Sequence, residues 1–191
     1  MQPKNNSIPP VPPVSIAAAA ASDQTPVNLA IALALADAGI PVYPASPFTK
    51  APLVLGGYKA ATTDRATIVA WFAKWPIALA AIPTGPVSGL FVLDVDGPAG
   101  RRSLNTLLAK LGVEQPADLS RVAVRTPSGG LHFYFTLRSG ETPRSRARDI
   151  APGLDTRGIG GGIIAPGNRL PDGRSYELID AADLPNFRGE A

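Results

Sequence analysis

Two aspartates, Asp94 and Asp96, end an apolar, strand-forming segment at residues 89–97. Successive strand side chains point to opposite faces, so residues two apart share a face and both carboxylates can converge on one point. Converging carboxylates repel each other unless a positive charge lies between them, and hard Mg²⁺ or Mn²⁺ suits oxygen ligands. The structural alternative is equally open here, because Asp96-Gly97-Pro98 is a favourable turn sequence before a helix.

The only histidine of the chain, His132, lies in a second segment, at residues 126–135. It follows closely after Gly129 and Gly130 and begins an aromatic stretch, and glycines let a backbone approach a ligand closely. His132 can therefore donate a hydrogen bond to a phosphate. The alternative is a histidine whose hydrogen bonds are satisfied within the sheet.

A third segment, at residues 153–166, combines Asp155, Arg157 and a run of three glycines. Asp155 and Arg157 share a face if the stretch is a strand, which places a carboxylate beside a guanidinium. The glycines cost conformational entropy and indicate close backbone approach. A surface ion pair beside a flexible loop is the alternative.

The elements that must position these residues are short helices mixed with short strands. The hydrophobic pattern and the capping residues predict helices at 28–38, 64–74 and 98–111, and Gly112 is expected to end the last of them. Strands are expected at 40–43, 78–82, 90–95, 121–125, 131–137, 154–157, 162–165 and 175–179, with a hairpin turn at 126–130. This mixture favours an α+β fold over a doubly wound parallel sheet.

The composition is that of one domain with a basic bias. The chain has 191 residues, 45% of them hydrophobic, and a net charge of +3. It has no cysteine and one histidine, so any metal must be held mainly by carboxylates. Nine arginines and four acidic residues lie between Arg121 and Arg174. Arginine favours phosphate contacts, which indicates a nucleotide or nucleic-acid partner, although an arginine-rich genome is a serious alternative explanation.

The first 25 residues or so are rich in Asn, Ser, Pro and Ala and are expected to form a flexible tail. No stretch reaches the roughly 20 apolar residues of a membrane helix, and prolines interrupt the place where the core of a signal peptide would lie. We therefore expect a cytoplasmic protein with no membrane partner.

The order of the motifs is similar to that of a known family. An Asp-x-Asp strand, a Gly-x-His strand and a hydrophobic–Asp strand with arginine and glycines resemble the archaeo-eukaryotic primase superfamily. More closely, they resemble the bifunctional DNA primase/polymerase (prim-pol) N-terminal domain of plasmid, phage and integrated-element replication proteins. The resemblance covers roughly residues 27–180 and includes upstream matches, among them Tyr43-Pro44, residues 50–53, residues 60–64, Ile68, Trp71, Trp75-Pro76, residues 82–85 and Ser88-Gly89.

The resemblance implies a fold and a domain division. The fold is an α+β primase-like catalytic core, with an RRM-like mixed or antiparallel sheet and flanking helices. The expected division is an N-terminal tail at 1–25, a catalytic domain at 26–185 and a short tail at 186–191. The sequence departs from the family pattern in two places. Pro166-Gly167-Asn168 stands where family members commonly have a Pro-Pro-Ser-like turn. Family members also often continue into a helicase or helix-bundle region, whereas the sequence here stops at Ala191. Nucleotidyl transfer is therefore expected more firmly than priming.

The resemblance also implies a mechanism: template-directed nucleotidyl transfer by a DNA primase or DNA polymerase. Asp94, Asp96 and Asp155 would hold two divalent ions, Mg²⁺ or Mn²⁺, and His132 would contact the triphosphate of the incoming nucleotide. Single-stranded DNA template and nucleoside triphosphates would be the partners, with a replicative helicase as a further one. Candidates for additional nucleotide contacts are Arg157 and Lys50, chosen on charge and placement, and Ser128, Gly129 and Gly130 through their backbone groups.

Three alternatives remain. A haloacid-dehalogenase-type phosphatase also has an Asp-x-Asp-Gly strand, but the late acidic pair of that family is absent. A non-catalytic module could bind single-stranded nucleic acid on the aromatic residues 133–135. The chain could also be an accessory protein of a mobile element. Finally, because Asp94 and Asp96 repel each other, replacing either is expected to leave the fold intact.

Overall fold

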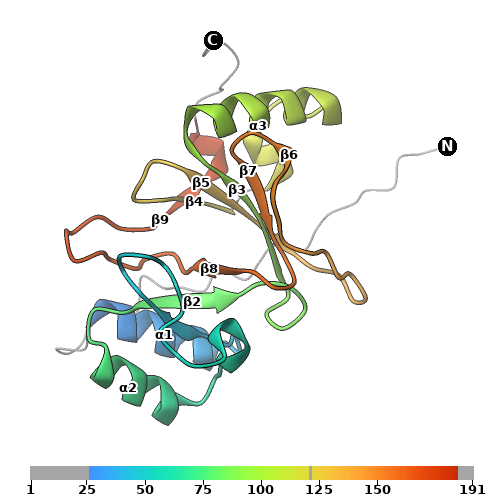
Figure 1. The fold of residues 1–191 in the computed structure, drawn as a ribbon. Helices are drawn as coiled ribbons and strands as arrows, with labels where there is room; N and C mark the ends of the chain where they lie inside the picture. Colours follow the sequence, from blue (N-terminus) through green and yellow to red (C-terminus); the bar gives the residue numbers. More distant parts are fainter. Residues whose placement is uncertain (1–25, 121, 185–191) are drawn as a thin grey trace.

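The computed structural model describes residues 26–120 and 122–184. These residues form a six-stranded and a three-stranded sheet, with helices packed on both (Figure 1). All paired strands within the two sheets are antiparallel, which confirms the predicted α+β fold. The two tails lie outside the described residues, so the division of the chain into tail, domain and tail stays a prediction.

The six-stranded sheet carries the motif strands at its centre. Its strand order is β6-β7-β3-β5-β4-β9. The strands are β3 (Leu90–Val95), β4 (Val122–Arg125), β5 (Leu131–Thr136), β6 (Arg146–Ala151), β7 (Leu154–Arg157) and β9 (Glu177–Asp180). The predicted hairpin joins β4 to β5: the Thr126 N–H donates to the Gly130 carbonyl at 2.9 Å, and Gly129 takes φ +84°. Glycine adopts this left-handed conformation without steric cost.

The three-stranded sheet has the order β1-β2-β8 and is made from distant parts of the chain. It comprises β1 (Tyr43–Ala45), β2 (Leu79–Pro83) and β8 (Gly162–Ile164), with α1 (Val27–Asp37), α2 (Arg65–Lys74) and the 3-10 helix η2 (Gly57–Ala60) around it. Asp64 begins α2 as predicted, because its carboxylate accepts the Thr67 N–H at 2.8 Å.

The two faces of the large sheet belong to two different cores. On one face, Leu93 and Val95 of β3 pack with Leu104 and Leu108 of α3 (Gly97–Leu111), near α4 (Pro116–Leu119) and η3 (Ala181–Asp183). On the other face, Val92 packs with residues of the small sheet and of α1 and α2. Figure 1 shows α3 on one side of the large sheet and α1 and α2 on the other. Strand alternation therefore turns Asp94, two residues after Val92, away from α3.

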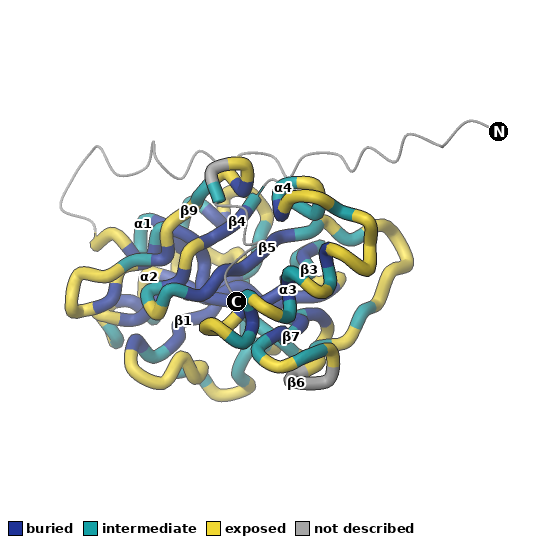
Figure 2. Tube along the Cα trace, turned by 90° about the horizontal axis from the view of Figure 1, so that it is seen from above, coloured by how far each residue is buried: buried dark blue, intermediate teal, exposed yellow. Residues whose placement is uncertain are grey.

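The buried residues concentrate in the strands, and exposed ones mark the connecting loops (Figure 2). Besides the two short 3-10 helices, β6 and α4 were not predicted. The β6 sequence Arg-Ala-Arg-Asp-Ile-Ala lacks the alternation of a half-buried strand, and α4 is a single turn. The strand expected at 40–43 begins only at Tyr43. Across the described stretches, no helix has both the length and the apolar character needed to cross a bilayer.

Candidate active site

Three of the candidate residues form one row across the centre of the large sheet. In the register of β3 with its two neighbours, Asp94 lies opposite His132 of β5 and opposite Asp155 of β7. Directly opposed residues in antiparallel strands point to the same face, so the three side chains are neighbours there. A one-residue slip of either pairing would turn a member of the row to the other face. We call Asp155, Asp94 and His132 the acidic row.

Arg157 joins the two carboxylates of this row. Its Nε and Nη2 donate to Asp94 Oδ2 at 3.1 and 2.7 Å, and Nη2 also donates to Asp155 Oδ2 at 3.1 Å. Arg157 and Asp155 lie two positions apart in β7, so they share a face, as strand alternation predicts. The guanidinium thus supplies the positive charge that two neighbouring carboxylates require.

Asp94 is the buried centre of the row, with 6% of its surface exposed. Burial opposes its ionisation, but the imidazole of His132, with Nε2 at 3.3 Å from Asp94 Oδ1, and the Arg157 guanidinium outweigh burial and lower the Asp94 pKa. Asp94 is therefore held as a carboxylate in a largely dry place. A carboxylate kept charged inside a protein by fixed partners is a common feature of functional sites.

Three buried polar atoms in this region have no hydrogen-bond partner: Asp94 Oδ1, His132 Nδ1 and the Tyr134 hydroxyl. The Asp94 carboxylate also raises the pKa of Tyr134, after the larger effect of burial, so the two groups lie within electrostatic range. Buried polar groups are nearly always paired in native proteins, and an unpaired cluster calls for a ligand, ion or water. The cluster is therefore consistent with a bound ion, ligand or water beside the acidic row.

Asp96 lies just beyond the end of β3 and is exposed. It occupies the N-cap position of α3, yet its side chain makes no capping hydrogen bond. The helix-cap alternative is therefore not what holds this carboxylate. Partial burial and the charges of Asp94 and Asp155 raise the Asp96 pKa, so the three carboxylates act on one another electrostatically.

The hairpin turn at 126–130 touches this carboxylate. A Cβ on Gly130 would lie 2.8 Å from the Val95 carbonyl oxygen and 3.2 Å from Asp96 Oδ1, so only glycine fits without a shift. Thr126 Oγ1 accepts the Gly130 N–H at 2.9 Å and lies 3.0 Å from the exposed Ser128 hydroxyl. The turn predicted to bind nucleotide therefore lies beside Asp96.

The donor set of this region fits a hard divalent cation in its chemistry. All three carboxylates are oxygen ligands, and Asp94 Oδ1 is a buried oxygen without a partner. In the part of the chain that the structure describes, however, no three acidic, histidine or cysteine side chains are grouped as metal ligands. Arg157 takes the Oδ2 atoms of Asp94 and Asp155 instead.

Lys50 reaches the same region from a distant loop. Its Nζ lies 6.0 Å from the ring centroid of Tyr176, and that ring lies 6.1 Å from the imidazole of His132. Burial and the charge of Arg174 lower the Lys50 pKa. Lys50 has φ +63°, which is unusual for a non-glycine residue, and its ammonium donates to the Pro47 carbonyl at 2.6 Å.

Tyr176 and Arg174 were missed from the sequence. Burial raises the pKa of Tyr176 to about 12, with further contributions from Asp94 and Asp96. Arg174 donates to the Pro127 carbonyl at 3.1 Å, so the segment before β9 contacts the hairpin turn. No motif marks either residue: Arg174 ends the arginine-rich stretch that begins at Arg121, and Tyr176 lies within the strand expected at 175–179.

The glycine run in the third segment serves packing within the protein. A Cβ on Gly161 would meet the hydroxyls of Ser145 and Thr84, and a Cβ on Gly162 would meet the hydroxyl of Tyr43. The close approach expected from these glycines therefore exists, but its partners are the chain's own side chains. Asn168, at the place of the family's serine, is fully buried and accepts the Ala80 N–H at 2.7 Å.

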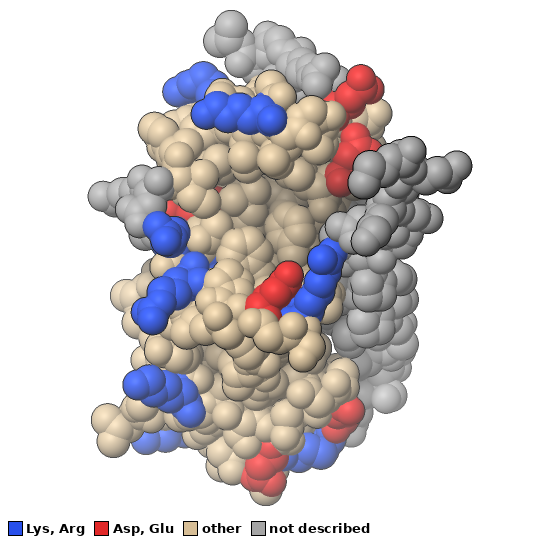
Figure 3. All heavy atoms as spheres, turned by 90° about the vertical axis from the view of Figure 1, so that its right-hand side faces the viewer, with Lys and Arg blue, Asp and Glu red and all other residues tan. Residues whose placement is uncertain are grey.

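The aromatic strand presents little surface for stacking bases. Phe133 and Tyr134 are 0% and 6% exposed and belong to the two opposite cores. On the face drawn in Figure 3, basic side chains lie apart from one another, with acidic ones among them, rather than in one continuous stripe. These observations weaken the interpretation of the chain as a stacking platform for nucleic acid.

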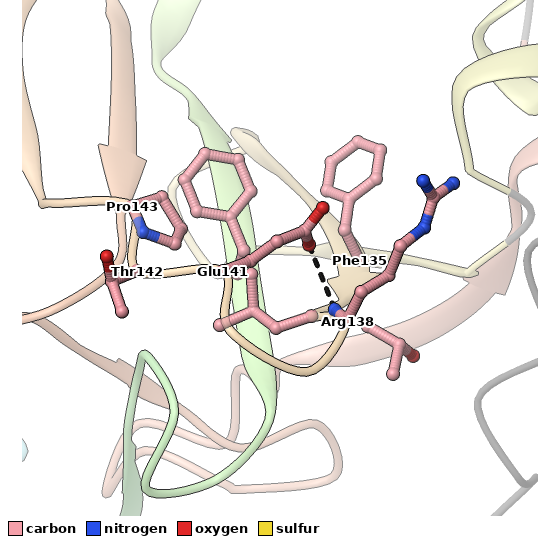
Figure 4. A pocket seen from close by; sticks show the side chains of 8 residues that line it. Phe135, Arg138, Glu141, Thr142 and Pro143 are labelled. Atoms are coloured by element: carbon pink, nitrogen blue, oxygen red, sulfur yellow. Dashed lines mark hydrogen bonds between the residues drawn. The ribbon is translucent and has the colours of Figure 1, made fainter.

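A pocket of about 530 Å³ lies at the other end of β3 and β5. Phe91 and Phe135 form its apolar wall, and Arg138 and Glu141 stand at its edge (Figure 4). Phe91 lies three positions from Asp94, so its side chain is on the opposite face of the sheet. This pocket is therefore separate from the acidic row.

Comparison with known proteins identifies the family. The sequence model of the bifunctional DNA primase/polymerase N-terminal domain, Prim-Pol, matches residues 32–187. A search of curated proteins found no match. The matched range includes every motif strand and all of the acidic row. The chain therefore belongs to the Prim-Pol family, whose members are nucleotidyltransferases with DNA primase and DNA polymerase activity.

Proposed function

We propose that the acidic row is the catalytic centre of a template-directed nucleotidyl transfer that extends DNA in the replication of a plasmid, phage or integrated element. The observation that carries this proposal is the alignment of Asp155, Asp94 and His132 on one sheet face, with buried, unpaired atoms on Asp94 and His132. A divalent cation would supply the positive charge that the Asp94 carboxylate can accept, and the phosphates of a deoxynucleoside triphosphate would supply an acceptor for His132. Single-stranded DNA is the template, and a replicative helicase is a partner of the same process.

Asp94, Asp96 and Asp155 are the residues that would hold two divalent ions, Mg²⁺ or Mn²⁺. When bound, such ions supply activation of the primer 3′-hydroxyl and neutralisation of the charge on the departing pyrophosphate. The protein contributes fixed positions: the sheet register holds Asp94 and Asp155, and the absence of a side chain at Gly130 leaves room for the Asp96 carboxylate beside the turn. Positioning and charge stabilisation account for most of the catalysis in such reactions.

The remaining groups are suited to holding the triphosphate. His132 lies in the acidic row with a buried, unpaired Nδ1, and the turn at Ser128, Gly129 and Gly130 lies beside Asp96. Arg157 and Lys50 bring positive charge from two sides. Arginine and lysine beside a histidine form an environment that favours a polyphosphate over an uncharged ligand.

Primer extension on single-stranded DNA tests the proposal. Wild-type protein with deoxynucleotides and Mg²⁺ or Mn²⁺ should extend a labelled primer, and Asp94→Asn and Asp96→Asn should each lose at least about a thousandfold in rate, as expected when a charged group of a preorganised site is neutralised. Asp37→Asn is the matched control, because Asp37 forms an exposed ion pair with Arg65 away from the row, and it should keep the wild-type rate. Circular dichroism checks that each variant is folded. No extension by folded wild-type protein with either metal would overturn the proposal.

The alternatives predict different results. Family membership argues against a haloacid-dehalogenase-type phosphatase. A non-catalytic binding module or an accessory protein would bind single-stranded DNA without extending it, and its binding would not change in Asp94→Asn. Metal-dependent binding of a deoxynucleoside triphosphate, lost in the same variant, separates the proposed enzyme from both.

A further inference from the structure

We propose that Arg157 is the internal counter-ion of the metal-free site and competes with a divalent cation for the carboxylates of Asp94 and Asp155. Metal binding would then release the guanidinium toward the triphosphate. This inference rests on the proposed function, because it concerns the same carboxylates. It assigns Arg157 a role that changes during the binding of metal and nucleotide.

The contacts of Arg157 are those of a shared cation. An arginine that serves one carboxylate usually places two nitrogens on its two oxygens. Here Nε and Nη2 both donate to one oxygen, Asp94 Oδ2, and Nη2 reaches across to Asp155 Oδ2. The guanidinium thus bridges the two carboxylates through their Oδ2 atoms, while Asp94 Oδ1 faces His132 Nε2 at 3.3 Å.

A divalent ion held by both carboxylates would be close to this guanidinium and would repel it. Two positive charges a few ångströms apart in a partly buried site repel each other more strongly than they would in bulk water. Arg157 already occupies one oxygen of each of these carboxylates, Asp94 Oδ2 and Asp155 Oδ2.

The two sides of the contact differ in freedom to move. The Asp94 and Asp155 side chains are 8% and 18% exposed and begin on central strands of the sheet. The Arg157 side chain is 32% exposed and has four rotatable bonds, so its head can turn toward solvent without disturbing the sheet. When a cation binds, the Arg157 side chain is therefore expected to move, and the two carboxylates to stay in place.

Direct measurement of Mn²⁺ binding tests the competition without requiring activity. Electron paramagnetic resonance counts free Mn²⁺ during a titration of the nucleotide-free protein at pH 8. Arg157→Gln should bind Mn²⁺ about tenfold more tightly than wild type, because the competing charge is gone. Arg157→Lys keeps a charge but loses the bridging fork, and its affinity should fall between the two. Arg65→Gln, which removes an exposed arginine–aspartate pair, is the matched control and should bind like wild type.

The same variants have a stability readout. Without metal, Arg157→Gln should unfold at a lower temperature than wild type, because two carboxylates lose their counter-ion, and saturating Mn²⁺ should restore more stability to this variant than to wild type. Equal or weaker Mn²⁺ affinity in folded Arg157→Gln would overturn the inference. If Arg157→Gln does not fold, Arg157→Lys decides, and an affinity equal to that of wild type overturns the inference.

The outcomes separate this inference from the proposed function. If the wild-type protein extends primers but the Arg157 variants bind Mn²⁺ no more tightly than wild type, only the proposed role of Arg157 is overturned. A wild-type protein that neither extends primers nor binds Mn²⁺ would sink the proposed function, and the inference with it.

Discussion

Asp94 and Asp96 lie two residues apart, and yet the structure treats them in opposite ways. Asp94 is buried within a paired strand, contacts Arg157 and His132, and has a lowered pKa. Asp96 lies past the end of the strand, is exposed and has a raised pKa. The first carboxylate is fixed by partners in the sheet, whereas the second lies at the start of α3, where its side chain makes no capping hydrogen bond.

This contrast shows how one motif can contain a rigid and an adjustable carboxylate. A carboxylate inside a sheet is positioned by strand register and cannot move far without breaking hydrogen bonds. Asp96, at the junction of strand and helix, keeps a backbone hydrogen bond from its N–H to the Gly153 carbonyl at 2.8 Å, but its exposed side chain makes no capping hydrogen bond and can adapt to an incoming group. The expectation that both aspartates could be removed without affecting stability does not suit Asp94, because that residue neutralises Arg157.

The largest expected effect on stability comes from removing the buried member. Asp94→Ala should lower the free energy of unfolding by about 2 kcal/mol at pH 7, because Arg157 and His132 lose their partner. This loss is smaller than for a fully buried ion pair, because the Arg157 side chain is partly solvated. The lowered Asp94 pKa stabilises the fold above the pKa of the unfolded chain, and this contribution is lost as the pH falls. Urea unfolding at pH 7 and pH 3 checks this, and an unchanged stability at pH 7 would contradict the pairing.

A smaller effect is expected at the contact that restrains Asp96. Gly130→Ala should cost about 1 kcal/mol, because its Cβ would press on the Val95 carbonyl oxygen, and should slow primer extension by roughly tenfold through displacement of Asp96. Gly112→Ala is the control, since it strains the left-handed end of α3 far from the row, at a similar cost in stability. If both variants extend primers equally well, Gly130 does not position Asp96.

The smallest predicted effect is a gain in stability rather than a loss. Asp96→Asn should raise the melting temperature of the metal-free protein by roughly 1–2 °C at pH 7, because it removes a carboxylate that its neighbours and partial burial disfavour. A raised folded-state pKa means that the ionised group costs stability at neutral pH and that this cost disappears as the pH falls below the pKa of the unfolded chain. Differential scanning calorimetry should therefore show the gain at pH 7 and none at pH 3. A lower melting temperature at pH 7 would show that Asp96 has a partner that stabilises it.

Much of the fold followed from local patterns in the sequence. The bounds of β3 and β7 are those expected from the apolar runs, and α2 and α3 begin and end near their predicted caps. β6 was missed because its charged residues give no alternation. The order of strands within the sheet is a long-range property that no local pattern specifies.

The candidate site, too, was predictable only in those parts that depend on local sequence patterns. Alternation placed Asp155 and Arg157 on one face, but only the register of three strands reveals that Asp94 lies between Asp155 and His132. The bridge from Arg157 to both carboxylates depends on that register. Tyr176 and Arg174 approach the row from a loop, where periodicity carries no information.

The acidic row also makes the site a late product of folding. Its members come from three strands that are distant along the chain. Each strand pairing must therefore close a long loop, and the conformational entropy lost in doing so is offset only once the contacts have formed. Both tryptophans lie elsewhere: Trp71 is in α2, and Trp75 follows its end. In a refolding experiment, tryptophan fluorescence should therefore recover before nucleotide binding does, and the interval between the two would time the docking of β7 onto β3.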